Sequence, residues 1–115
     1  MRRLNIAYRD RAEALRTALA RHAPGLTPVS AHGGSALWVS AAKGCDTRAL
    51  AARLYRQGVV VEPGDVFFAG ARQPRQHLRI GYSSIPVDRI EAGVRVIGRE
   101  LASMTRAQRV QAARR

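Results

Sequence analysis

The 115 residues of this chain are enough for one domain and leave no room for a second core. Hydrophobic residues make up 46% of the chain, which excludes a disordered protein. Charges interrupt every apolar run, so neither a signal peptide nor a membrane span is expected. The lone Cys45 excludes an internal disulfide and a multi-cysteine metal site, and it indicates a reducing compartment, the cytoplasm.

The formal net charge of +12 leaves two interpretations of the basic residues open. All of them except Lys43 are arginine, and alanine is abundant, a pairing that a GC-rich coding sequence also produces. Proteins that bind nucleic acid specifically concentrate basic residues on one face or interleave them with aromatics, which are only 5% here. The alternative function that the charge allows is a small basic module that binds nucleic acid or a protein partner.

Apolar residues at helical spacing predict an amphipathic helix over 2–22, which Pro24 and Gly25 end. No capping residue precedes this helix, which is the pattern expected of a domain cut from a longer protein. The predicted apolar stripe consists of Leu4, Tyr8, Ala12, Leu15, Ala18 and Leu19.

Two short strands are predicted around Gly33 and Gly34. The second, ALWVSA, places Leu37 and Val39 on one face and Trp38 on the other.

The segment DTRALAARLYRQG predicts a second helix, with Asp46 or Thr47 as its N-cap and Gly58 as its terminator. The inward positions are Leu50, Ala51 and Leu54.

The run VVV at 59–61 predicts a buried strand that the following Glu62-Pro63-Gly64 breaks. After a polar loop and a strand over 77–83, a third helix is predicted to open at Ser84-Ile85-Pro86. Its expected buried residues are Val87, Ile90, Val94, Ile97 and Leu101.

This order of elements predicts an α+β fold, a two-layer sandwich in which a small, mostly antiparallel sheet has helices on one face. The other face would be open, or covered by something that this chain lacks.

Residue sets for catalysis are missing from the sequence. No pair of the eight acidic residues has the spacing of an acid and base couple, and the three histidines have no metal-ligand spacing. HGGSALWV leads into a strand, so it is not a phosphate-binding loop, and Lys43 is expected in a solvated turn. The chain alone is therefore predicted not to be an enzyme.

Arg79 is the strongest candidate for a binding residue. In HLRIGYS, Leu78 and Ile80 point to one side, and Arg79 points to the other with Gly81 and Ser83. A guanidinium binds a carboxylate through two parallel N–H groups, and small neighbours leave room for it. The alternative is a solvated arginine on an open sheet, which most such arginines are. No acidic residue is expected on a strand facing Arg79, so we expect an accessible side chain without an intramolecular carboxylate partner.

Three ordered motifs resemble the C-terminal small domain of fold-type I PLP-dependent aminotransferases: GGSALWV, GVVVEPGDVFF and LRIGYSSIPVDRIEAGVRVI. EPGDVFF and GYSSIP are most similar to the MocR-type branch of the GntR family. These regulators fuse a winged-helix DNA-binding domain to an aminotransferase-like domain. The resemblance covers residues 1–102, and 103–115 are expected to be a basic tail.

The resemblance implies roles for individual residues. Arg79 matches the arginine that binds the α-carboxylate of an amino-acid substrate or effector. The glycine pair matches a point where the backbone approaches the ligand, although a simple turn is an equal alternative. This glycine pair is Gly33 and Gly34. The remaining matches, at the rim of the site, are Pro63, Gly64 and Phe68.

In this family, the Schiff-base lysine, the carboxylate that holds the pyridine nitrogen and the phosphate-binding cup lie in a large domain. The resemblance therefore implies a fragment with half of a substrate site and no cofactor site, from a parent that binds PLP and an amino acid. That parent is an aminotransferase or a MocR-type regulator, and any DNA binding would require its winged-helix domain. The sheet face left without its partner domain predicts self-association.

Overall fold

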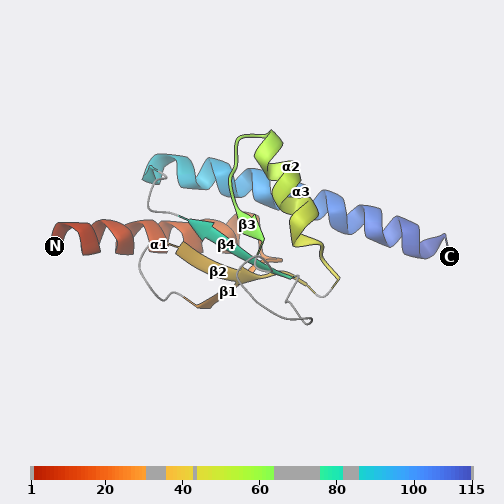
Figure 1. Ribbon diagram of the computed structural model, residues 1–115, viewed down its shortest axis with the longest axis horizontal. Coiled ribbons are helices and arrows are strands. Elements are labelled where there is room, and N and C mark those ends of the chain that lie inside the picture. The colour runs from red at the N-terminus through yellow and green to blue at the C-terminus, as the bar shows by residue number, and fades with distance from the viewer. Residues whose placement is uncertain (1, 31–35, 43, 64–75, 82–85, 115) are drawn as a thin grey trace.

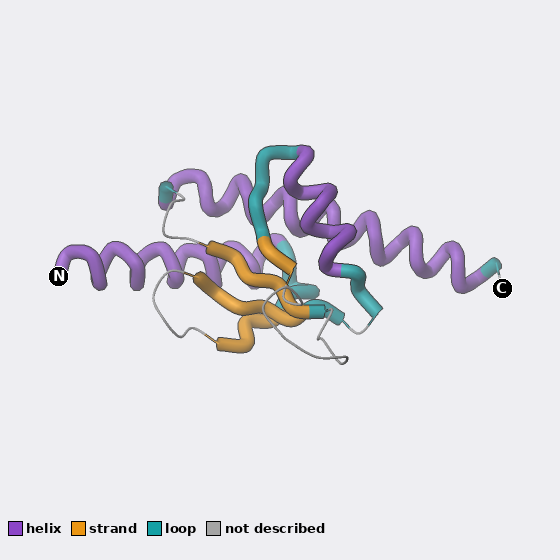
Figure 2. Tube along the Cα trace, in the orientation of Figure 1, coloured by secondary structure: helices purple, strands orange, loops and turns teal. Residues whose placement is uncertain are grey.

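A computed structural model describes residues 2–30, 36–42, 44–63, 76–81 and 86–114 of the chain. These residues form three helices and four strands (Figures 1 and 2). In chain order, the elements are α1 (Arg2–His22), β1 (Thr27–Ser30), β2 (Ala36–Ser40), α2 (Thr47–Arg56), β3 (Glu62–Pro63), β4 (His77–Gly81) and α3 (Val87–Ala113).

The four strands form one antiparallel sheet in the order β1-β2-β4-β3. Pro28 and Pro63 lie in the two edge strands, where a residue without an N–H group disturbs the sheet least. The register of β1 shifts between Pro28 and Ser30, as at a β-bulge. The predicted α+β fold is confirmed.

One face of the sheet forms the core with the helices. Alternate strand residues are buried on this face, as the sequence predicted. They join residues of α1, α2 and α3 in a single apolar cluster. The largest members are Leu15, Leu19, Leu37, Val39, Leu50, Leu54, Leu78, Ile80, Ile90, Val94 and Ile97.

The first helix has the predicted limits, and it packs against α3 more extensively than any other pair of elements packs (Figure 1). Leu15, Ala18 and Leu19 are buried, and Ala12 is partly buried. The side chains of residues 1–8 lie outside the described part of the chain, so Leu4 and Tyr8 stay predictions.

Local signals also define α2. Asp46 is its N-cap, and Oδ1 of Asp46 accepts hydrogen bonds from the N–H groups of Arg48 and Ala49 at 3.1 and 3.2 Å. Beyond the C-cap, Gly58 has a φ of +83°, a conformation that favours glycine. Leu50 and Leu54 are fully buried, as predicted.

The prediction of a buried strand at 59–61 is wrong. Val60 is 65% exposed, and only Val61 is buried. The strand is instead Glu62–Pro63, the segment that was expected to break it. Proline is compatible with this position because β3 is an edge strand.

The third helix differs from its prediction at both ends. Pro86 is its N-cap, and Val87, which was expected to be buried, is 50% exposed. Met104 is buried near the other end, while Leu101 is only partly buried. The helix continues to Ala113, so most of the expected basic tail is helical. None of the helices in the described part of the chain is long and apolar enough to span a membrane.

Candidate carboxylate-binding site

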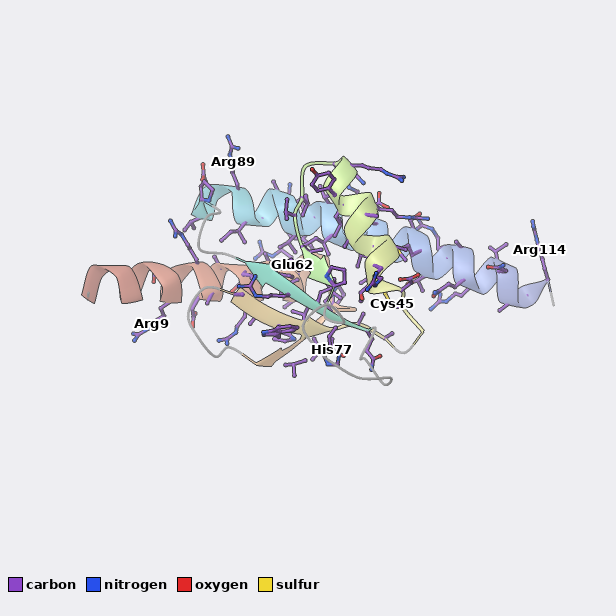
Figure 3. All side chains as sticks on the ribbon, in the orientation of Figure 1. Arg9, Cys45, Glu62, His77, Arg89 and Arg114 are labelled. Atoms are coloured by element: carbon purple, nitrogen blue, oxygen red, sulfur yellow. The ribbon has the colours of Figure 1, made fainter. Side chains whose placement is uncertain are left out.

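Arg79 lies at the middle of β4, on the sheet face that points away from the core. Its neighbours Leu78 and Ile80 are buried on the opposite face, as predicted. Its side chain is 28% exposed, and Nη1 donates a hydrogen bond to Oε1 of Glu62 at 2.7 Å. Glu62, which lies in the edge strand β3, is labelled in Figure 3.

The expectation that Arg79 has no intramolecular carboxylate partner is therefore wrong. Glu62 belongs to β3, and β3 pairs with β4 so that Glu62 lies directly opposite Arg79. Residues opposite each other in an antiparallel pair project from the same face with their β-carbons about 5 Å apart. The pairing was missed because Glu62-Pro63 was interpreted as the end of a strand.

A groove of about 740 Å³ opens beside this ion pair. On this edge β3 pairs only with Leu78 and Arg79, and the described residues place no strand beside Ile80 and Gly81, which line the groove. Both Arg79 and Glu62 line it. Most of its other walls are apolar and come from the α2–β3 segment and α3, including Val59, Val60, Val61, Ile90, Val94 and Ile97. The groove thus combines an apolar wall with two arginines, Arg79, which is already bound to a carboxylate, and Arg89 of α3.

Trp38 extends this face on the other side of Arg79. It lies opposite Arg79 on β2, so Trp38, Arg79 and Glu62 form a row across three strands. Trp38 is half-buried. His77, two residues before Arg79, has a buried Nδ1 without a hydrogen-bond partner among the residues that the structure describes (Figure 3).

Four of the six residues matched to the site cannot be compared with the structure. Gly33, Gly34, Gly64 and Phe68 lie outside the described residues, as does Lys43, while Pro63 lies in β3 next to Glu62. The structure instead adds Glu62 and Trp38 to the surroundings of Arg79. The role of Glu62 could have been predicted from strand alternation, because a buried Val61 places the next side chain, Glu62, on the outward face.

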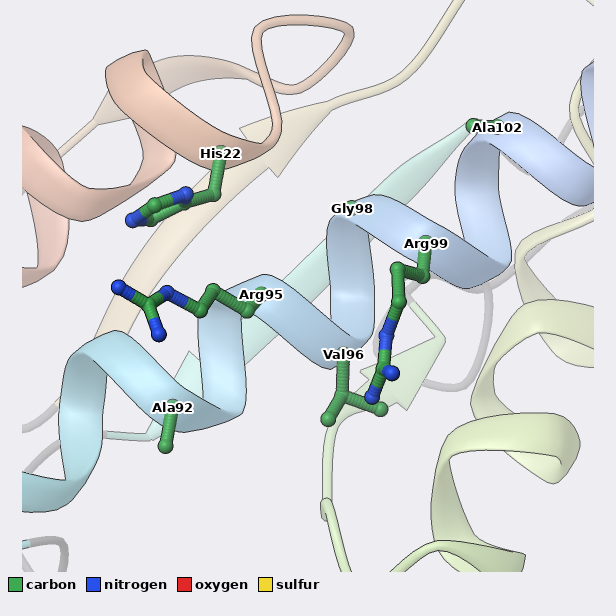
Figure 4. Close-up of a pocket in the computed structure, with 7 residues that line it drawn as sticks. All are labelled: His22, Ala92, Arg95, Val96, Gly98, Arg99 and Ala102. Atoms are coloured by element: carbon green, nitrogen blue, oxygen red, sulfur yellow. The ribbon is translucent and has the colours of Figure 1, made fainter.

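A second groove, of about 680 Å³, lies between the end of α1 and α3 (Figure 4). His22 and Arg95 extend toward each other there, and both bind Oε1 of Glu91, at 3.0 and 3.4 Å. The hydrogen bond from His22, supported by the charges of Arg95 and Arg21, lowers the pKa of Glu91. His22 and Arg95 of this groove therefore already share an acidic partner.

The described residues contain no group of three or more His, Cys, Asp and Glu side chains that could hold a metal ion. Cys45 is a free, half-buried thiol (Figure 3). Burial, and to a smaller extent the charge of Asp46, raises its pKa. A protonated thiol is a poor nucleophile.

Comparison with curated proteins finds two kinds of relative. The transcriptional regulator TauR of Rhodobacter capsulatus is 39% identical over 99 residues, which are 86% of this chain and 20% of the regulator. The 2-aminoadipate transaminase of Thermus thermophilus is 30% identical over 105 residues, 90% of this chain and 26% of the transaminase. The chain thus spans about a fifth to a quarter of each relative. No family model matches the chain.

Solved structures share the fold. LysN, an α-aminoadipate aminotransferase from Thermus thermophilus that was solved with N-(5'-phosphopyridoxyl)-L-leucine, gives a TM-score of 0.78 at 30% identity. The match covers 87% of this chain and 26% of LysN. A multiple-substrate aminotransferase from Thermococcus profundus gives 0.75 at 28% identity, over 86% of this chain and 25% of that protein. The chain is therefore homologous to one domain of these proteins, the small domain that fold-type I PLP-dependent aminotransferases share with MocR-type regulators.

Proposed function

We propose that this chain supplies the carboxylate-binding part of an amino-acid site in a larger aminotransferase or aminotransferase-like regulator. Arg79 is the residue that binds the carboxylate. The observation that carries the proposal is the position of Arg79: half-buried on the outer sheet face, at an apolar groove, in a domain homologous to aminotransferases.

The groove suits this role because of its polarity. A guanidinium can offer two parallel N–H groups to a carboxylate. Val61 and Ile80, on the core side of this sheet edge, give the groove an apolar wall against which the side chain of an amino acid can pack. Gly81, the next residue on the same face, carries no side chain that would block a ligand beside Arg79.

The described residues do not by themselves fit a covalently bound PLP. The only lysine of the chain is Lys43, which lies outside them, and no amine lines the groove. In this proposal, the cofactor belongs to the rest of the protein, and the domain contributes recognition of the amino acid. DNA binding, which the name of TauR suggests for that regulator, would likewise need a domain outside this chain.

The test uses the full chain and a matched pair of ligands. L-Leucine carries a free carboxylate, and L-leucinamide has the same side chain and amine without it. Binding is followed by the Nε–H resonance of Arg79 and by the fluorescence of Trp38, the only tryptophan, which lies opposite Arg79. We expect a weak, saturable response to leucine, a much smaller one to leucinamide, and none in Arg79→Gln.

The control variant is Arg95→Gln, which removes an arginine of the other groove and should bind leucine like the wild type. Equal responses to leucine and leucinamide would overturn the proposal, as would leucine binding that survives in Arg79→Gln.

The alternative, a basic module that binds nucleic acid, has only the net charge of +12 in its favour. The exposed arginines are spread over α1, α2 and α3, and Arg21, Arg53 and Arg95 form ion pairs with Glu91 or Glu100. Binding to DNA that weakens steeply as salt is added would favour this alternative.

A further inference from the structure

We infer that Glu62 sets the affinity of Arg79 for a ligand carboxylate, because its own carboxylate occupies the guanidinium and a ligand binds by displacing it. This inference rests on the proposed function of Arg79.

The sheet holds the two side chains together. Glu62 lies opposite Arg79 and Pro63 lies opposite Leu78, so backbone pairing fixes the position of Glu62 relative to the guanidinium. Its carboxylate is therefore present at a high effective concentration whether or not a ligand is bound. Nη1 of Arg79 and Oε1 of Glu62 are 2.7 Å apart, the distance of a charge-assisted hydrogen bond.

The same contact is weak enough to be exchanged. Water reaches both partners, since the side chains of Arg79 and Glu62 are 28% and 44% exposed. Ion pairs that water reaches contribute little stability because both partners lose solvation and side-chain entropy when they pair. Glu62 is thus a competitor that a ligand can displace, because the ion pair that has to break is exposed to water and not buried.

Charge makes the exchange selective. Two carboxylates beside one guanidinium repel each other at close range, so a ligand carboxylate and Glu62 compete for Arg79. A ligand that carries an amide instead of a carboxylate has no negative charge to replace that of Glu62 beside Arg79. Glu62 therefore favours anionic ligands over neutral ones, besides lowering the affinity for both.

The experiment compares the full wild-type chain with Glu62→Gln, Arg79→Gln and the double variant, using L-leucine as the probe and L-leucinamide as its control. Glutamine keeps the size of the side chain and removes the charge. Glu62→Gln should bind leucine about two- to fivefold more tightly than the wild type, the range expected when an exposed ion pair no longer competes. The double variant should lose this gain. Glu91→Gln, which removes the carboxylate that pairs with His22 and Arg95 beside the other groove, should leave leucine binding unchanged.

Two outcomes separate this inference from the proposed function. If neither the wild type nor Glu62→Gln binds leucine through Arg79, both are overturned. If the wild type binds through Arg79 and Glu62→Gln binds equally or more weakly, only the role of Glu62 is overturned.

A measurement on the wild type alone covers the case in which a variant fails to fold. The side-chain carboxyl carbon of Glu62 should shift in the NMR spectrum as leucine is added, and it should not shift with leucinamide. A Glu62 resonance that stays constant while the Arg79 resonance responds to leucine would overturn the displacement.

Discussion

The α-carbon of Gly98, in the middle of α3, lies against the carbonyl oxygen of His22, the last residue of α1. A β-carbon at this position would overlap that oxygen. The close approach of the two helices at this point therefore depends on a residue without a side chain.

Gly98→Ala should destabilise the fold by about 1–3 kcal/mol, because the overlap with a backbone atom forces α1 and α3 apart. Alanine's higher helix propensity, worth about 1 kcal/mol, offsets only part of this. Gly93→Ala in the same helix is the matched control. Nothing lies within 4 Å of its added β-carbon, so this variant should be more stable than the wild type by about 0.5–1 kcal/mol of unfolding free energy. Urea unfolding of the two variants measures the difference. Equal stabilisation by both alanines would contradict the close contact.

Stability should decrease in acid partly through Glu91. The hydrogen bond from His22, with the charges of Arg95 and Arg21, lowers the pKa of this carboxyl in the folded state. A lowered pKa contributes stability above the unfolded value, about 4.3, and this contribution disappears as the pH falls through the folded value. The melting temperature of Glu91→Gln should therefore be lower than that of the wild type at neutral pH, and the difference between the two should close below about pH 4. A gap that is independent of pH would point to packing instead of charge.

Cys45 should react slowly with thiol reagents at mildly alkaline pH. Burial raises the pKa of its thiol, and the charge of Asp46 adds to the effect. Asp46→Asn removes the charge but keeps a residue that caps helices well, so the reaction should become faster while α2 remains intact. The rate of reaction with a disulfide reagent, compared with that of free cysteine, is the measurement. An unchanged rate in Asp46→Asn would leave burial as the whole cause.

The role of Arg79 can be tested in a working enzyme. In a chimera, this chain would replace the matching quarter of the Thermus 2-aminoadipate transaminase. Arg79→Lys should then weaken amino-acid binding by about 1.5–3 kcal/mol, since lysine keeps the charge and loses the paired N–H groups. Steady-state kinetics should show a higher KM. The free energy of unfolding, derived from thermal melts, should change by less than about 0.5 kcal/mol. Wild-type KM in Arg79→Lys would exclude the arginine from substrate binding.

Self-association of the chain stays a prediction. Its dependence on salt concentration distinguishes it from binding to a polyanion. Trp38 lies on the outer sheet face and Val29 of the edge strand β1 is 56% exposed, while the net charge of +12 opposes association. Added salt screens this repulsion, so sedimentation velocity should show more association at high salt, the reverse of binding to a polyanion. A monomer at every concentration and salt level would count against it.

The sequence by itself determined the features that depend on neighbouring residues. The limits of α1 follow from helical periodicity and from Pro24-Gly25, and the ends of α2 follow from Asp46 and Gly58. The alternation that places Arg79 opposite to Leu78 and Ile80 is equally local. The aminotransferase-like small domain is likewise indicated by three motifs that are each contiguous in the sequence.

Only the tertiary structure decided which residues meet. A strand of two residues has no periodicity of its own, so β3 and the pairing of Glu62 with Arg79 become visible only when β4 lies beside it. The burial of Met104 and the need for glycine at position 98 likewise depend on how α3 packs. The physical reason is that caps and periodicity act over a few residues. Partners across the sheet, by contrast, are fixed by the packing of segments that are distant in sequence.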